Sequence, residues 1–254
     1  MSRQQTFVVL TTQRSGSGWL VDLLDDHPSI AAYEELFKVT ETTVSYHGGS
    51  AVPTFEVMVP PGVFSTSAGL VQRRYEYVRS LRRAHPEARA VGFKLMYDQT
   101  RDHPGLLTVL ALSRARVVHL VRRDGLSAIV SFDVAHERDR WHYYAGEAVP
   151  APRIRMDTTR LLERLRDRDE EIERFRRRLR RMALPVLEIG YEDLRDRRDE
   201  TLQAVLEFLR VRPPGRPLRS SVVQVARGGT LDLVENRDDV VAALGGTPYA
   251  ALAR

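Results

Sequence analysis

Short apolar runs separated by helix-length segments form the main pattern along the chain. Four such runs, rich in β-branched residues, cover residues 6–12, 90–96, 115–121 and 185–190. Runs of this length and composition are typical of buried strands. Strands that alternate with helix-length segments are typical of βα units. The pattern therefore predicts an α/β fold with a central parallel sheet flanked by helices on both faces.

A long amphipathic helix is predicted for residues 157–182. Apolar residues recur there at helical intervals beneath a charged face, at Leu161, Leu162, Leu165, Ile172, Phe175, Leu179 and Met182. The many arginines of this segment are interleaved with Asp and Glu, which favours a solvated helix face over a nucleic-acid-binding surface. A second helix is predicted for residues 201–209, before the Pro-Pro-Gly sequence at residues 213–215.

Residues 40–69 have no clean periodicity. They are rich in Thr, Ser, Gly, Pro and Val, and we expect a long loop with room for one short helix. Long loops in compact domains are often functional. We therefore expect this loop to lie over a functional site.

Length and composition change this picture little. The 254 residues, 43% of them hydrophobic, fit one domain over residues 1–254. The chain has no apolar run of 18 residues and begins with a polar segment, so we expect no membrane span, no secretory signal and a cytoplasmic protein. The absence of cysteine excludes disulfides, thiolate nucleophiles and cysteine-ligated metals. The net charge of +5 indicates an anionic partner without identifying it.

The first candidate site follows the strand at residues 6–12. It reads Gln13-Arg14-Ser15-Gly16-Ser17-Gly18-Trp19 and leads into the apolar spacing of a helix. Glycines let the backbone approach an anion, and a helix N-terminus offers free N–H groups, so the loop is suited to a phosphate or sulfate. No lysine follows Gly18, which argues against a Walker-type nucleotide triphosphatase. A glycine turn required only for packing is the alternative.

The second candidate site follows the strand at residues 115–121. Arg123 lies at the end of that strand, and Ser131 lies about two turns into the next helix. Because ligands of open α/β sheets bind at the carboxyl ends of the strands, this pair can meet the same ligand as the first loop. Two anion sites imply a doubly anionic ligand. A structural arginine and a helical serine are the alternative.

Four blocks in order, QRSGSGWL, GFKLMYDQ, LVRRDGLSAIVSF and IGYEDL, resemble the sulfotransferases that use 3′-phosphoadenosine 5′-phosphosulfate (PAPS). The bacterial carbohydrate sulfotransferases of the trehalose and Nod-factor type are the most similar group. The resemblance implies a P-loop-kinase-like α/β domain that binds PAPS without a metal. It also implies sulfuryl transfer to a hydroxyl of a carbohydrate, glycolipid or glycosylated small molecule, and it leaves a homodimer open.

The resemblance implies roles for individual residues. Arg14 matches the basic residue that holds the 5′-phosphosulfate and stabilises charge on the leaving oxygen. Arg123 and Ser131 match the ligands of the 3′-phosphate. Tyr191 matches an aromatic near the adenine, with simple packing as the alternative. The remaining matches are the loop residues Ser15, Gly16, Ser17, Gly18 and Trp19, and Arg227 in a phosphate loop, Arg227-Gly228-Gly229, that lacks the family's middle lysine.

A base must accept the proton of the attacking hydroxyl. Glu34 and Glu35 in AAYEELF resemble the glutamate block of carbohydrate-sulfating relatives, and the position of Phe37 selects Glu35. An exposed helix start is the alternative. Glu34, Lys94, Trp141 and His142 are assigned to the acceptor side, with His142 as a further candidate base. Lys94 either lies buried beside a carboxylate or faces the acceptor.

Two other functions are compatible with parts of the sequence. A nucleotide-dependent small-molecule kinase of similar fold would require Mg²⁺ and is disfavoured because the P-loop lysine is missing. A non-catalytic anion-binding or nucleic-acid-binding protein would use the arginine-rich helix and show steep salt dependence. Interleaved acidic residues argue against that function, so we expect no nucleic-acid partner.

Overall fold

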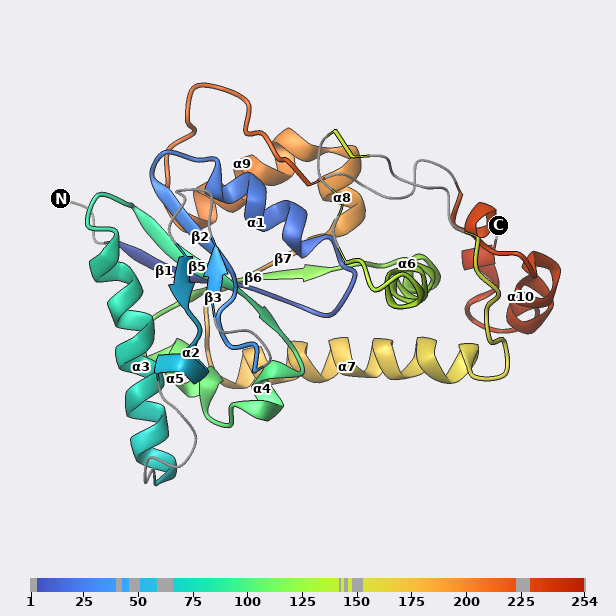
Figure 1. The fold of residues 1–254 in the computed structure, drawn as a ribbon, viewed down its shortest axis with the longest axis horizontal. Coiled ribbons are helices and arrows are strands. Elements are labelled where there is room, and N and C mark those ends of the chain that lie inside the picture. The colour runs from blue at the N-terminus through green and yellow to red at the C-terminus, as the bar shows by residue number, and fades with distance from the viewer. Residues whose placement is uncertain are drawn as a thin grey trace.

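The computed structural model describes residues 4–39, 43–45, 51–58, 66–141, 143, 146–147, 153–222 and 229–253. Its centre is a parallel five-stranded sheet with the strand order β2-β5-β1-β6-β7 (Figure 1). The strands are β1 (Gln5–Thr11), β2 (Ile30–Glu35), β5 (Ala90–Met96), β6 (Arg116–Val121) and β7 (Val186–Gly190). The sequence-based prediction of the fold class is confirmed.

The central strands are covered on both faces. All seven residues of β5 and six of seven in β1 are buried, as expected for parallel strands between two helical layers. The register pairs Thr11 of β1 with Met96 of β5 and with Leu120 of β6. The loops that follow these three strands therefore leave the sheet at one common edge.

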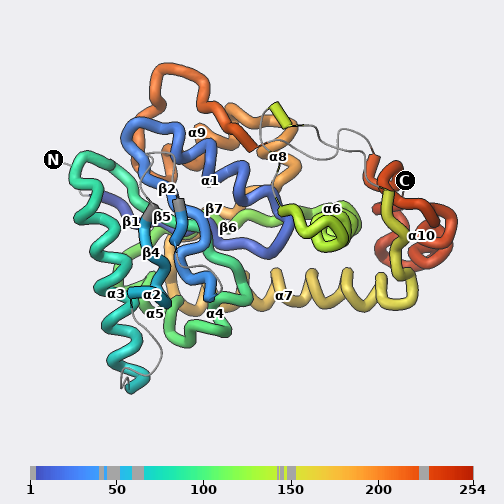
Figure 2. Tube along the Cα trace, viewed as in Figure 1, coloured from blue at the N-terminus to red at the C-terminus, as the bar shows by residue number. Residues whose placement is uncertain are grey.

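Helices cover the two faces and the carboxyl edge of the sheet (Figures 1 and 2). One face carries α1 (Ser17–Asp25), α8 (Tyr191–Asp196) and α9 (Arg198–Leu209). The other face carries α3 (Ser67–Ala84), α4 (Gln99–Asp102), α5 (Leu106–Leu112) and α7 (Leu161–Arg181). Beyond the edge, a separate apolar cluster joins the start of α7 to α6 (Gly125–Glu137), η1 (Thr230–Leu233), α10 (Arg237–Leu244) and η2 (Ala250–Ala253).

Two predictions about secondary structure were wrong. Residues 30–35 form a strand, so the possibility of an exposed helix start at Glu34 is excluded. The segment expected to be a loop contains a two-stranded antiparallel hairpin, β3 (Thr43–Ser45) and β4 (Ala51–Pro53), besides the short helix α2 (Phe55–Met58). Threonine and valine, which broke the helical periodicity there, are good strand formers. In the described part of the chain, no helix is both long and apolar enough to cross a membrane.

Candidate functional site

A cavity of about 1230 Å³ opens at the carboxyl edge of the sheet. Its lining comes from the β1–α1 loop, the ends of β2 and β5, the β6–α6 connection, α8 and η1. Most of the expected site residues line it: Arg14, Gly16, Ser17, Gly18, Trp19, Glu34, Glu35, Lys94, Ser131, Trp141 and Tyr191. Ser15 and Arg123 do not line the cavity. His142 and Arg227 lie outside the described residues.

The loop after β1 bends sharply toward the cavity. Gly16 has a φ of +79° and is the N-cap of α1, so the first N–H groups of α1 lie beside the cavity. A Cβ atom at Gly16 would lie 2.4 Å from Cδ2 of Tyr191, which excludes any side chain there without movement of that ring. Arg14 also adopts the left-handed region, with a φ of 58°. The geometry fits an anion at a helix N-terminus.

Arg14 connects two other parts of the cavity lining, Ser131 and Trp141. Its Nε donates to Oγ of Ser131 at 2.9 Å, and its Nη1 donates to the carbonyl oxygen of Trp141 at 2.6 Å. The first loop and the α6 serine expected at the second anion site therefore meet directly.

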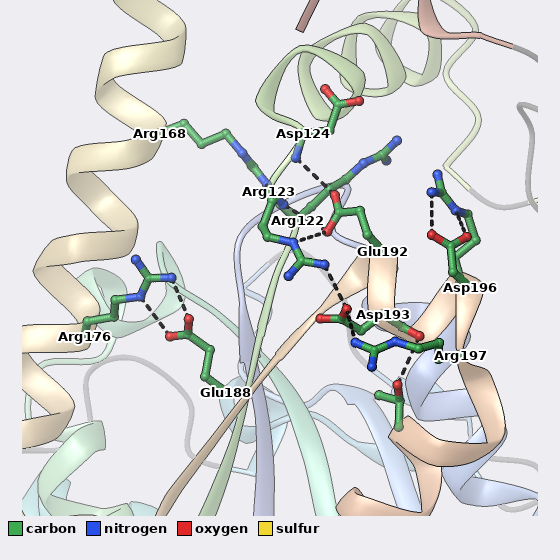
Figure 3. Close-up of polar contacts among 12 residues, drawn as sticks. Arg122, Arg123, Asp124, Arg168, Arg176, Glu188, Glu192, Asp193, Asp196 and Arg197 are labelled. Atoms are coloured by element: carbon green, nitrogen blue, oxygen red, sulfur yellow. Dashed lines mark hydrogen bonds and ion pairs between the residues drawn. The ribbon is translucent and has the colours of Figure 1, made fainter. Parts of the chain in front are cut away.

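Of the two consecutive arginines after β6, the structure brings Arg122 to the cavity. Arg122 lines it, donates to the carbonyl oxygen of Arg14 at 3.1 Å, and stacks over the ring of Tyr191 at 4.6 Å. Arg123 is 59% exposed and instead contacts Asp193 at 2.9 Å and Glu192 at 3.4 Å (Figure 3).

Contacts of both the side chain and the backbone with α8 hold Arg123 away from the cavity. Glu192 also accepts hydrogen bonds from the backbone N–H groups of Arg123 and Asp124, at 3.2 and 3.0 Å. The hydrogen bond with Asp193 raises the pKa of Arg123. In this structure Arg123 is already neutralised by carboxylates of α8.

Ser15 lies behind the loop. It is fully buried, and its Oγ accepts a hydrogen bond from Nη2 of Arg168, a residue of α7, at 3.2 Å. Ser17, in contrast, lines the cavity. Tyr191 is 9% exposed and lies between Gly16 and Arg122, so it connects the two loops.

Three guanidinium groups, those of Arg14, Arg122 and Arg168, converge on these loops. Among the described residues, no ion pair involves Arg14, Arg122 or Arg168. Burial lowers the pKa of all three, and the nearby Arg122 lowers it further for Arg14 and Arg168. The Nε atoms of Arg122 and Arg168 are buried, with no hydrogen-bond partner among the described residues. Buried cations normally have a counter-charge, so this end of the cavity fits an anionic ligand.

The opposite end of the cavity contains carboxylates. Lys94 of β5 is 4% exposed and contacts Glu34 closely and Oε1 of Glu35 at 3.0 Å. Oε2 of Glu35 accepts a hydrogen bond from Nε2 of Gln99 at 2.7 Å. Burial alone would lower the pKa of Lys94, but the two carboxylates outweigh it and raise that pKa above its usual value.

An irregularity in β2 brings two consecutive glutamates to one lysine. Tyr33 pairs with Phe93 and Glu35 pairs with Lys94, so Glu34 is an extra residue in β2. In a regular strand, neighbouring side chains point to opposite faces. The bulge removes this alternation locally, and such bulges are frequent next to active sites.

The sequence interpretation missed three polar residues of the site. Arg122 was overlooked in favour of its neighbour, because residue spacing alone does not decide which of two adjacent arginines faces a cavity. Arg168 had a signal, since it interrupts the apolar stripe between Leu165 and Ile172. Gln99, which donates a hydrogen bond to Glu35, had no such signal in the sequence.

Fold and site together define an α/β protein that is suited to bind an anionic ligand at the carboxyl edge of its sheet. A model of the sulfotransferase family matches residues 6–213. The chain therefore belongs to the sulfotransferase family. No curated protein matches the sequence.

The comparison with solved structures finds sulfotransferases of low sequence identity. The sulfotransferase domain from the curacin biosynthetic pathway is 14% identical over 99% of this chain and 90% of that chain, with a TM-score of 0.50. A sulfotransferase from Alicyclobacillus acidocaldarius is 14% identical over the whole of both chains, with a TM-score of 0.49. The sulfotransferase domain of the Synechococcus PCC 7002 olefin synthase is 16% identical over 100% and 87%, with a TM-score of 0.47.

Proposed function

We propose that the protein transfers a sulfuryl group from PAPS to a hydroxyl group of a carbohydrate, a glycolipid or a glycosylated small molecule. One observation carries the proposal. One cavity has a guanidinium end, where no carboxylate of the described residues forms an ion pair, and opposite it a carboxylate end built around one lysine. An anionic donor and a hydroxyl acceptor that must lose a proton need these two environments. Membership of the sulfotransferase family supports the reaction class.

The guanidinium end would hold the nucleotide. Arg14 and the N–H groups of residues 16–18, which lie beside the cavity, would bind the 5′-phosphosulfate. Arg122 and Ser131 would bind the 3′-phosphate, and the ion pair of Arg123 with Asp193 favours Arg122 over Arg123 for that role. When bound, PAPS supplies an activated sulfuryl group whose leaving group is adenosine 3′,5′-bisphosphate (PAP).

Arg14 and the N–H groups of residues 16–18 would stabilise charge on the leaving 5′-phosphate oxygen, because fixed donors in a site of low water content stabilise developing negative charge strongly. Neither Arg14 nor Arg122 is proposed to transfer a proton. Arginine stays protonated in proteins even when burial lowers its pKa.

Glu35 is the proposed general base. Its carboxylate is held from both sides by Lys94 and Gln99, which leaves lone pairs on the oxygens to accept a proton from an acceptor hydroxyl. Glu34 is the more exposed of the two glutamates, at 36% against 22%. We assign Glu34 to acceptor binding, and Lys94 to the orientation of both carboxylates.

The acceptor would lie between the carboxylates and Trp141. The indole of Trp141 is 40% exposed and lines the cavity. An exposed aromatic face beside carboxylates is suited to a sugar ring, which presents both an apolar face and hydroxyl groups. This arrangement supports the carbohydrate class of acceptor.

Calorimetric titration with PAP, adenosine 5′-monophosphate and ATP in metal-free buffer tests the proposed donor. PAP is expected to bind at least about tenfold more tightly than the monophosphate, because its second phosphate adds charge-assisted hydrogen bonds of about 1.5–3 kcal/mol each. The ATP titration is repeated with Mg²⁺ added, and tighter binding of ATP with Mg²⁺ than of PAP would overturn the proposal in favour of a kinase. A positive result justifies an acceptor screen with radiolabelled PAPS.

A further inference from the structure

We propose that Arg168 of α7 is a positioning residue that fastens the two anion-binding loops to one another. The proposal rests on the proposed function, because it assigns a role within that site. The proposal also assigns a function to one residue of the arginine-rich helix, whose charged face was expected only to be exposed to solvent.

The position of Arg168 along α7 is that of a core residue. The buried apolar residues of the helix form a stripe with intervals of three, four and seven residues: Leu161, Leu165, Ile172, Phe175 and Leu179. Residue 168 lies three residues after Leu165 and four before Ile172, so it falls on the same stripe. A guanidinium group at such a position loses hydration, and a leucine would pack there without that cost.

The contacts of Arg168 reach both loops. Its Nη1 lies 3.4 Å from the carbonyl oxygen of Gln13, and its Nη2 lies 3.2 Å from Oγ of Ser15, in the loop after β1. The same Nη2 lies 3.5 Å from the carbonyl oxygen of Arg122, in the connection after β6. Figure 3 shows the side chain extending from α7 toward Arg122. A planar guanidinium with five N–H donors can bridge separate acceptors in this way, whereas a lysine ammonium has one centre.

Arg168 is not explained as a partner in an ion pair. Within the part of the chain that the structure describes, none of its hydrogen-bond partners is a carboxylate, and burial followed by repulsion from Arg122 lowers its pKa. Each of its three acceptors is a carbonyl or a hydroxyl of a loop that lines the cavity or leads to it. The contacts of Arg168 therefore hold the two loops in place.

The helix that carries Arg168 is itself held firmly. One turn before it, Arg164 makes two hydrogen bonds to Asp133 of α6, at 2.8 and 2.6 Å. Two turns after it, Arg176 pairs with Glu188 of β7, and hydrogen bonds from His119 and Arg176 lower the pKa of Glu188 to about 2 (Figure 3).

Arg168 thus projects from a helix that is held to α6 before this residue and to β7 after it. Loops held in this way present the 5′ and 3′ subsites at a set separation, which reduces the ordering cost of binding a doubly anionic ligand.

Four variants test the role of Arg168. Arg168→Met keeps the length and completes the apolar stripe, and Arg168→Lys keeps the charge. Ser15→Ala removes one acceptor. Arg177→Met, at an exposed position of the same helix, is the matched control.

Affinities for PAP and for adenosine 3′- and 5′-monophosphates are measured by calorimetry, and unfolding temperatures are measured without ligand. Arg168→Met is expected to weaken PAP binding by roughly tenfold or more, because it removes the hydrogen bonds from a charged donor that hold the two loops in place. Both monophosphates should bind more weakly, while the unfolding temperature stays unchanged or rises. Arg168→Lys should recover only part of the affinity, and Arg177→Met should match the wild type.

A double-mutant cycle isolates the contact with Ser15. If Arg168 acts through Ser15, the effects of Arg168→Met and Ser15→Ala on PAP affinity are non-additive. A lower unfolding temperature with wild-type PAP affinity would assign Arg168 a purely structural role. Weakened binding of only one monophosphate would also overturn the proposal that Arg168 fastens both loops.

Hydrogen exchange separates this inference from the proposed function. Without any ligand, Arg168→Met should accelerate amide exchange in both loop segments, 13–18 and 122–125, relative to Arg177→Met. If the wild type fails to bind PAP, the proposed donor is wrong, and this exchange result still decides whether Arg168 fastens the loops. Faster exchange in only one segment, or in neither, would overturn the inference.

Discussion

The two ends of the cavity differ in how their cations are paired. Arg14 and Arg122 contact neutral oxygens and an aromatic ring, and no carboxylate among the described residues pairs with them. Lys94 contacts two carboxylates and is almost fully buried. A cation that forms no ion pair within the protein can attract an anionic ligand. A lysine that already contacts two carboxylates instead holds those carboxylates in place. On the proposed function, the cations at one end would bind the anionic donor, and the lysine at the other end would orient the two carboxylates.

The same contrast separates neighbours in the sequence. Arg122 and Arg123 are adjacent, yet Arg123 is neutralised by α8 and Arg122 is not. Counting arginines would treat the two alike. The carboxylates around each residue determine which one can bind a phosphate.

The largest expected effect is at the carboxylate end. Glu35→Gln should lower kcat by about 100-fold or more, the usual contribution of a general base, and should leave PAP affinity within about twofold of the wild type. Steady-state kinetics and calorimetry measure the two quantities. Glu34→Gln is the control, with a smaller loss of kcat. Full activity of Glu35→Gln would assign the base to another residue.

The next effect distinguishes the adjacent arginines. Arg122→Ala should weaken PAP binding by about 2 kcal/mol, roughly 30-fold, because it removes charge-assisted hydrogen bonds to a phosphate. Arg123→Ala should change the affinity by less than about 1 kcal/mol, since an exposed ion pair contributes little. Calorimetric titration of both variants decides between them. A larger loss in Arg123→Ala would restore the assignment made from sequence spacing.

The smallest effect concerns the shape of the loop. Gly16→Ala places a Cβ atom against Tyr191 at a positive φ, and we expect PAP affinity to fall by about tenfold, since the left-handed conformation alone costs about 1–2 kcal/mol. Gly215→Ala has a similar φ of +75° but no atom within 4 Å, so it controls for backbone strain. Equal PAP affinities in both variants and the wild type would show that close packing at Gly16 is not required.

The sequence predicts the fold better than the site. The four predicted strands agree with β1, β5, β6 and β7 to within one residue at each end, because buried parallel strands are continuous apolar runs. Strand β2 was missed because Glu34 and Glu35 end it with two acidic residues. The bulge that turns both toward Lys94 depends on pairing with β5, which no local pattern encodes.

The site was predicted in outline and not in its orientations. The β1–α1 loop, Ser131, Glu35 and Lys94 line one cavity, as expected from the common edge of a parallel sheet. The roles of these residues stay predictions. The direction of Arg122 against Arg123 depends on Glu192 and Asp193, about 70 residues further along the chain. Long-range contacts of this kind leave no trace in residue spacing.

The bulge in β2 has a consequence for product release. Glu34, Glu35 and Lys94 together carry a net charge of −1, from two negative charges and one positive charge. On the proposed function, a neutral hydroxyl acceptor enters this end of the cavity and leaves as a sulfate ester with a negative charge. Immediately after transfer Glu35 holds the proton of the acceptor, and loss of that proton to solvent restores the net charge of −1. Like charges at close range repel each other, so this net charge then favours departure of the sulfated product. The same three residues would then select for the acceptor before transfer and against the product after it.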